Sequence, residues 1–155
     1  MNIYDILSNL NIHYEEVSHP AIYTIKDAIN ANILSKIEGT ECKNLFVKSK
    51  NDYYLILIEA TKRVDFKKLA QTINTSKLSF CSEEELKTIL NLNIGSVTPL
   101  GIINDQNNLI TLLIDQDLKE KKILVHPNIN TKTISINYQD LIKFIEYTNH
   151  KYLFF

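Results

Sequence analysis

Short apolar runs separated by polar turns extend along the whole of this chain of 155 residues. Two of the strongest runs predict strands at about 43–48 and 53–60, and the polar residues 49–52 between them indicate a hairpin. Further strands are predicted at 12–17, 78–80, 109–114, 123–125 and 131–136.

Apolar residues spaced three or four apart predict helices between these strands. The helices are expected at 2–10, 24–31, 66–73, 82–90 and 138–147. Capping residues stand at three of the starts, namely Thr24 with Asp27, Asp65, and Ser82 with Glu85. Because hairpins and crossovers alternate irregularly, we expect an α+β class, a mixed β-sheet or barrel flanked by helices, in a single domain spanning 1–155.

Composition agrees with a folded protein and restricts where it works. The hydrophobic fraction of 45% and the charged fraction of 23% are ordinary. No apolar run approaches the ~20 residues of a membrane helix, and the first residues lack a basic segment followed by an apolar one. Cys42 and Cys81 form no C-x-x-C pair. We therefore expect a cytoplasmic protein without disulfides and without a membrane partner.

The formal net charge of −1 argues against broad phosphate neutralisation of a nucleic acid. Two lysine-rich clusters, at 62–68 and 119–122, remain as sites of local phosphate contact. Such clusters are also common on solvated faces, and the sequence leaves both interpretations open.

The sequence predicts neither a metal site nor a cofactor. Its four histidines are scattered without metal-ligand spacing, and its three glycines form neither a phosphate loop nor a dinucleotide fingerprint. Cys42 adjoins a lysine, but neighbours on a strand point to opposite faces, so a small apolar filler is favoured over a nucleophile.

Lys43 and Asn44 stand out because they interrupt an apolar strand. An interior lysine can donate three hydrogen bonds to a ligand, whereas the simpler interpretation is an edge-strand lysine that faces water. Two loops add polar chemistry: 95–101, where glycine permits close approach of a ligand, and 126–128, which carries His126. His126 is either a pocket residue or a turn histidine bonded to the backbone.

Taken together, five segments resemble the YbaK/prolyl-tRNA-synthetase-associated editing domains. The resemblance covers roughly 13–147 and is carried by 43–46 (Lys-Asn-Leu-Phe), 61–69, 77–86, 95–105 and 126–131. The asparagine that follows the lysine resembles the pattern of the free-standing ProX branch of Ala-tRNA(Pro) deacylases. In the Cys-tRNA(Pro) branch, threonine usually follows this lysine. We see no synthetase segment in the sequence and expect action in trans.

The resemblance implies a mixed β-barrel flanked by helices that hydrolyses an aminoacyl ester in translation proofreading, without metal or cofactor. Lys43 and Asn44 match the functional lysine and its neighbour, and are the expected catalytic residues. The expected substrate-binding residues are Leu45, Phe46, Gly95, Pro99, Leu100, Gly101, His126 and Asn128. This sequence departs from the pattern at Cys81, where alanine is common, and in the tail 149–155, which has no counterpart.

The implied partner is the acceptor end of mischarged tRNA(Pro), with Ala-tRNA(Pro) the expected substrate, bound by a monomer. Association with prolyl-tRNA synthetase is left open. No strong side-chain base is evident, so the free hydroxyl of the terminal ribose is expected to help orient the water. Alternatives are a Cys-tRNA(Pro) deacylase, a non-catalytic module that binds aminoacyl-tRNA, and a structural domain with an ordinary core lysine.

Overall fold

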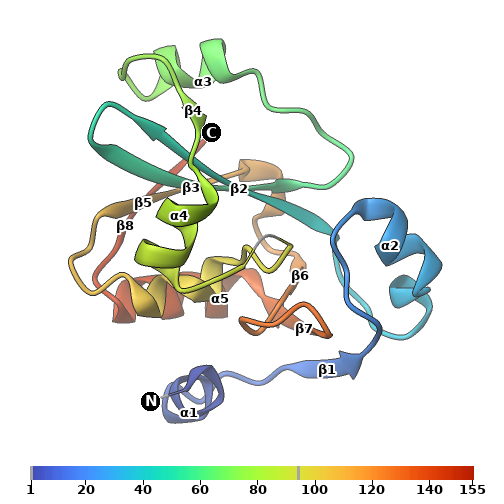
Figure 1. The fold of residues 1–155 in the computed structure, drawn as a ribbon. Coiled ribbons are helices and arrows are strands. Elements are labelled where there is room, and N and C mark those ends of the chain that lie inside the picture. The colour runs from blue at the N-terminus through green and yellow to red at the C-terminus, as the bar shows by residue number, and fades with distance from the viewer. Residues whose placement is uncertain (1, 94) are drawn as a thin grey trace.

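The computed structural model describes residues 2–93 and 95–155, and its strands form two sheets (Figure 1). The larger sheet has five strands in the order β4 (Ser79–Phe80), β2 (Cys42–Ser49), β3 (Asp52–Glu59), β5 (Ile110–Ile114) and β8 (Lys151–Phe154). The smaller, antiparallel sheet has the order β1 (Glu15–Ser18), β7 (Lys132–Asn137) and β6 (Lys122–Val125). The predicted α+β class is confirmed.

The larger sheet is mixed because tight and long connections alternate. The predicted hairpin is present: β2 and β3 are antiparallel, Ser49 pairs with Asp52, and Lys50 takes a left-handed φ of 56° in the turn. By contrast, β5 runs parallel to both β3 and β8, and parallel neighbours need long crossovers. A bridge between Thr40 and Ile123 joins the two sheets beside the start of β2.

The helices that follow β3 lie in these crossovers. From β3 to β5 the chain passes through α3 (Phe66–Thr72), β4, α4 (Glu83–Glu85), the π-helical turn η2 (Leu86–Leu90) and the 3₁₀ helix η3 (Pro99–Asn104). From β5 to β8 it passes through the 3₁₀ helix η4 (Gln116–Leu118), β6, β7 and α5 (Tyr138–Tyr147). The predicted helix at 82–90 is therefore α4 continued by η2, and it ends at Asn91 with a left-handed φ of 54°.

Both faces of the larger sheet are covered, which explains the continuous apolar runs in β3 and β5. One face packs with α5, α1 (Ile3–Asn9) and the smaller sheet into the main core, where Phe144 is fully buried. The other face packs against α3 through Ile56, Ile58 and Leu69 (Figure 1). The apolar pattern thus fixes which strands lie at the centre.

Local signals located helix ends well and strand ends less well. The predicted capping boxes of Thr24 with Asp27 and of Ser82 with Glu85 are both formed. The strand predicted at 12–17 is shorter, because the Ile12 amide closes the end of α1 on the Leu7 carbonyl at 2.9 Å. Within the described residues, no helix combines the length and apolar character needed to cross a membrane.

The tail, which the resemblance left unplaced, forms the edge strand β8. His150 anchors it, since its Nε2 lies 2.9 Å from Oδ2 of Asp105 and both side chains are almost fully buried. This long-range pairing is invisible in the local pattern of the tail.

Candidate functional site

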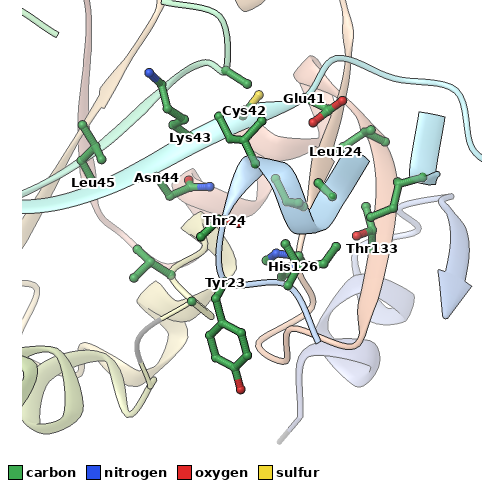
Figure 2. A pocket seen from close by; sticks show the side chains of 18 residues that line it. Tyr23, Thr24, Glu41, Cys42, Lys43, Asn44, Leu45, Leu124, His126 and Thr133 are labelled. Atoms are coloured by element: carbon green, nitrogen blue, oxygen red, sulfur yellow. The ribbon is translucent and has the colours of Figure 1, made fainter. Parts of the chain in front are cut away.

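A cavity of about 350 Å³ opens beside the first half of β2 (Figure 2). The segment that carries α2 (Ile25–Asn30) and the 3₁₀ helix η1 (Ile33–Ser35) forms one wall, and the ends of β6 and β7 form another. The lining residues are Ile22, Tyr23, Thr24, Ile25, Ala28, Ile33, Glu41, Cys42, Lys43, Asn44, Leu45, Ala60, Gly95, Val97, Leu124, Val125, His126 and Thr133. Five predicted site residues are among them: Lys43, Asn44, Leu45, Gly95 and His126.

Lys43 and Asn44 leave β2 on opposite sides, as strand alternation requires (Figure 2). The Lys43 ammonium donates a hydrogen bond to the carbonyl of Lys62. Asn44 extends toward α2, and its Oδ1 is buried without a hydrogen-bond partner among the described residues. Its amide nitrogen is therefore the polar atom that this side chain offers to the cavity. A buried amide with an unsatisfied oxygen carries a stability cost, which suits a functional rather than a structural role.

His126 contributes a hydrogen-bond acceptor. Its Nδ1 lies 2.9 Å from the carbonyl of Lys132, which can only accept, so Nδ1 carries the proton. Burial lowers the pKa of His126; the Lys132 hydrogen bond opposes this, and the nearby His19 lowers it further. The ring is thus neutral near pH 7, and its Nε2 lone pair has no partner in the described part of the chain.

Thr133 provides a second acceptor that sequence reasoning missed. The Nδ1 of His19 lies 2.8 Å from the Pro20 carbonyl and donates to it, so the Thr133 hydroxyl, 2.8 Å from Nε2, donates to the ring. The lone pairs of the Thr133 oxygen remain free on a residue that lines the cavity. The only local indication of this acceptor was the inward position of Thr133 in the alternating pattern of β7.

Gly95 lies beneath the ring of Tyr23, at the mouth of the cavity. A Cβ on Gly95 would stand 2.6 Å from Cδ1 of Tyr23, and the residue has a φ of +86°. Both the close approach and the left-handed backbone require glycine. The Tyr23 side chain is 62% exposed, so it forms the rim rather than the floor.

The remaining predicted binding residues do not line this cavity. Phe46 is buried in the main core and stacks on Tyr53, with ring centroids 5.8 Å apart. Pro99, Leu100 and Gly101 are buried in η3, and neither they nor Asn128 are among the lining residues.

The loop at 98–101 supports the turn that carries His126. The Thr98 hydroxyl donates to the His126 carbonyl at 2.6 Å, and Asn128 Nδ2 lies 3.5 Å from the Leu100 carbonyl. The loop predicted as a pocket wall, 95–101, thus divides in two: Gly95 and Val97 line the cavity, whereas 98–101 is buried because Leu92 packs against Gly101.

The cysteines are not poised as nucleophiles. Burial, with added repulsion from Asp115 and other carboxylates, raises the pKa of Cys42 to about 12. Burial likewise raises the pKa of Cys81 to about 12. Both thiols stay protonated at neutral pH. Across 2–93 and 95–155, no group of three His, Cys, Asp or Glu residues is placed to hold a metal ion.

Comparison with known proteins identifies the family. The model of the aminoacyl-tRNA editing domain matches residues 19–144. The chain belongs to this family. The resemblance found in the sequence is confirmed, and the match spans the strand of Lys43, the His126 turn and both walls of the cavity.

Relatives across the editing family cover most of the chain. It is 32% identical over 145 residues to the prolyl-tRNA editing protein ProX of Acetoanaerobium sticklandii, which spans 90% of this chain and 86% of that protein. It is 28% identical over 150 residues to the prolyl-tRNA synthetase associated domain-containing protein 1 of Danio rerio, covering 94% and 80% of the two chains. A crystal structure of a candidate trans-editing enzyme for prolyl tRNA synthetase superposes with a TM-score of 0.74 at 21% identity, over 97% of this chain and 92% of that one. This likeness supports the fold.

Proposed function

We propose that this protein is an aminoacyl-tRNA deacylase that acts in trans on mischarged tRNA(Pro), with Ala-tRNA(Pro) as its substrate. The observation that carries the proposal is a cavity, in an editing-domain chain, that has hydrogen-bond donors on one wall and neutral acceptors on another. The similarity to ProX, a prolyl-tRNA editing protein, supports tRNA(Pro) as the carrier.

The donors suit the ester carbonyl. Hydrolysis places negative charge on the carbonyl oxygen, and donors fixed in advance around that oxygen lower the barrier. The side-chain donors of β2 are the Asn44 amide nitrogen, on the side of the strand that faces α2, and the Lys43 ammonium, on the opposite side. In this proposal the Lys43 ammonium, which bonds to the Lys62 carbonyl, reaches the ester around the edge of β2.

The acceptors suit the terminal adenosine and the attacking water. His126 Nε2 and the Thr133 oxygen each accept a hydrogen bond from a ribose hydroxyl or from water. Neither the protonated thiol of Cys42 nor the imidazole of His126, whose pKa is lowered, is a strong base. In this proposal the free ribose hydroxyl next to the ester therefore orients the water. Glu41 is a carboxylate in the lining and is the alternative base for the attacking water. An unchanged rate in Glu41→Gln supports assistance by the substrate hydroxyl, and a large loss of rate supports Glu41 as the base.

Substrate choice follows from size. A synthetase site built for proline discriminates against a smaller side chain by only ~1–3 kcal/mol, so alanine is the expected error. The lining near Leu45, Val97 and Val125 is apolar and suits a methyl group. The prolyl ring adds bulk at the same position, so the correct ester is spared.

Parallel single-turnover assays on Ala-, Cys-, Ser- and Pro-tRNA(Pro) test the proposal. We expect the alanyl ester to be hydrolysed fastest and the prolyl ester to persist. Preference for the cysteinyl ester contradicts the assigned substrate, and tight binding without turnover of any ester contradicts catalysis. Asn44→Ala should lose activity, while the matched control Asn107→Ala, at an exposed turn, should keep it.

A further inference from the structure

The Lys43 ammonium is held from outside its own strand. Its hydrogen bond reaches the carbonyl of Lys62, 19 positions further along the chain, in the segment that follows β3. An ammonium has three donors, so this bond leaves two for a ligand. The position of the Lys62 carbonyl therefore decides where those two donors point.

The Lys62 side chain fixes the backbone that carries this carbonyl. Its ammonium lies 2.9 Å from Oδ1 of Asp115 and 2.5 Å from Oδ2 of Asp117. Lys62 therefore links two parts of the structure: its ammonium bonds to Asp115 and Asp117 at η4, and its backbone carbonyl bonds to Lys43.

Asp115 is the fixed end of this connection. It is only 2% exposed, and its Oδ1 also accepts the amide of Asp117 at 3.0 Å, while Oδ2 accepts the amide of Glu59 at 3.2 Å. Its own amide donates to the Leu57 carbonyl at 2.9 Å. The carboxylate thus joins the ends of β3 and β5, two central strands that cannot shift without disturbing the core.

Both partners stay charged at neutral pH. The hydrogen bonds to Asp117 and Asp115 raise the pKa of Lys62 to about 12. Burial alone raises the pKa of Asp115, but the bonds from Lys62, Asp117 and Glu59 reverse this and lower it. A buried carboxylate that loses its cation is strongly unfavourable, so the pair persists rather than opening by chance.

We propose that the Lys62–Asp115 ion pair is a positioning device that aims the Lys43 ammonium at the substrate. The inference rests on the proposed function, in which Lys43 is a catalytic donor. Lys62 and Asp115 act through Lys43 and are positioning residues. When the ion pair is lost, the Lys62 backbone carbonyl is no longer held in place. The Lys43 ammonium then keeps its charge, but its orientation is no longer fixed.

The kinetics of two variants that break the ion pair, Lys62→Met and Asp115→Asn, test this proposal. We expect the single-turnover rate constant at saturating protein to fall about tenfold in each, because small misplacement of a catalytic group is costly. The dissociation constant for uncharged tRNA should change less than about twofold. The matched control is Lys87→Met, which removes the same charge from an exposed position on η2 and should keep the rate.

A double-mutant cycle separates positioning from general stabilisation. If Lys62 acts through Lys43, adding Lys62→Met to Lys43→Ala causes no further loss of rate. Additive losses overturn the proposal, as does a normal rate in Lys62→Met. Lys62→Arg, which keeps the ion pair, should restore most of the rate. Should Lys62→Met unfold, Asp117→Asn provides the milder variant, since that carboxylate is 63% exposed and only one of two partners.

A readout independent of turnover completes the test. ¹H–¹⁵N spectra of lysine ammonium groups should show a Lys43 resonance, assigned by its absence in Lys43→Arg, that shifts in Lys62→Met and not in Lys87→Met. An unchanged Lys43 resonance in Lys62→Met overturns the positioning role. A wild-type protein that deacylates no ester contradicts the proposed function, and the spectra still decide whether the ion pair holds Lys43.

Discussion

Replacing Lys43 by alanine should separate folding from catalysis. Within the described residues the side chain makes a single hydrogen bond, to the Lys62 carbonyl at a half-buried position. A bond of this kind contributes about 1 kcal/mol to the free energy of unfolding. A donor aimed at a developing oxyanion lowers the activation barrier by about 3 kcal/mol, which corresponds to roughly 100-fold in rate. The variant should therefore fold and lose nearly all activity.

Single-turnover deacylation of Ala-tRNA(Pro) and thermal unfolding measure the two effects separately. Lys48→Ala is a matched control on the same strand, where the ammonium bonds Glu85 at 2.8 Å. It removes the same charge and a comparable hydrogen bond at a position outside the cavity lining, and should lower the midpoint of unfolding without changing the rate. Lys43→Met, which keeps the apolar stem, should unfold later than Lys43→Ala and be equally inactive.

The result that refutes the catalytic role is a folded Lys43→Ala protein with a rate within about threefold of wild type, because a missing oxyanion donor costs far more than that. Equal loss of rate in Lys48→Ala would also refute it, since the effect would then follow charge rather than position. Either outcome would return Lys43 to an edge-strand lysine whose task is structural.

Three further changes have distinct expected outcomes. His126→Ala should raise KM about tenfold and lower the single-turnover rate less; because burial lowers its pKa, wild-type KM should rise only as the pH falls below 6.5, and a flat pH profile contradicts the acceptor role. Gly95→Ala should cost ~1–2 kcal/mol in unfolding for the left-handed φ and displace Tyr23, so an unchanged midpoint in thermal unfolding contradicts the strain. Asp105→Asn should cost about 3 kcal/mol by breaking a buried pair. Burial raises the pKa of Asp105, but His150 and two backbone amides lower it overall, so its stabilisation should be lost as the pH falls below 3.8 in acid titrations of wild type but not of the variant.

Much of the fold could be predicted because its signals are local. The β2–β3 hairpin, the caps at Thr24 and Ser82, and α5 all follow from bonds and contacts within four residues of the chain or from simple alternation. Lys43 and Asn44 stood out for the same reason, since a charge and an amide interrupt an apolar strand.

Prediction of the cavity lining was less complete. The glycine and proline of the 98–101 loop suggested an open wall, yet Leu92 stands 2.6 Å from where a Cβ of Gly101 would lie, and the loop is buried. Phe46 follows Asn44 on the same face of β2 but lies deeper, where the main core replaces the cavity. Composition of a loop does not reveal what packs against it.

The sequence by itself determined the elements, the class of fold, the family and the unusual lysine and amide, because each depends on patterns that the chain carries locally. Only the tertiary structure decided which polar groups meet. His19 reaches Thr133 across 114 positions, and Lys62 reaches Asp115 across 53. Each pair forms where two strands of one sheet lie side by side, β1 with β7 and β3 with β5, and no spacing along the chain encodes which strands become neighbours.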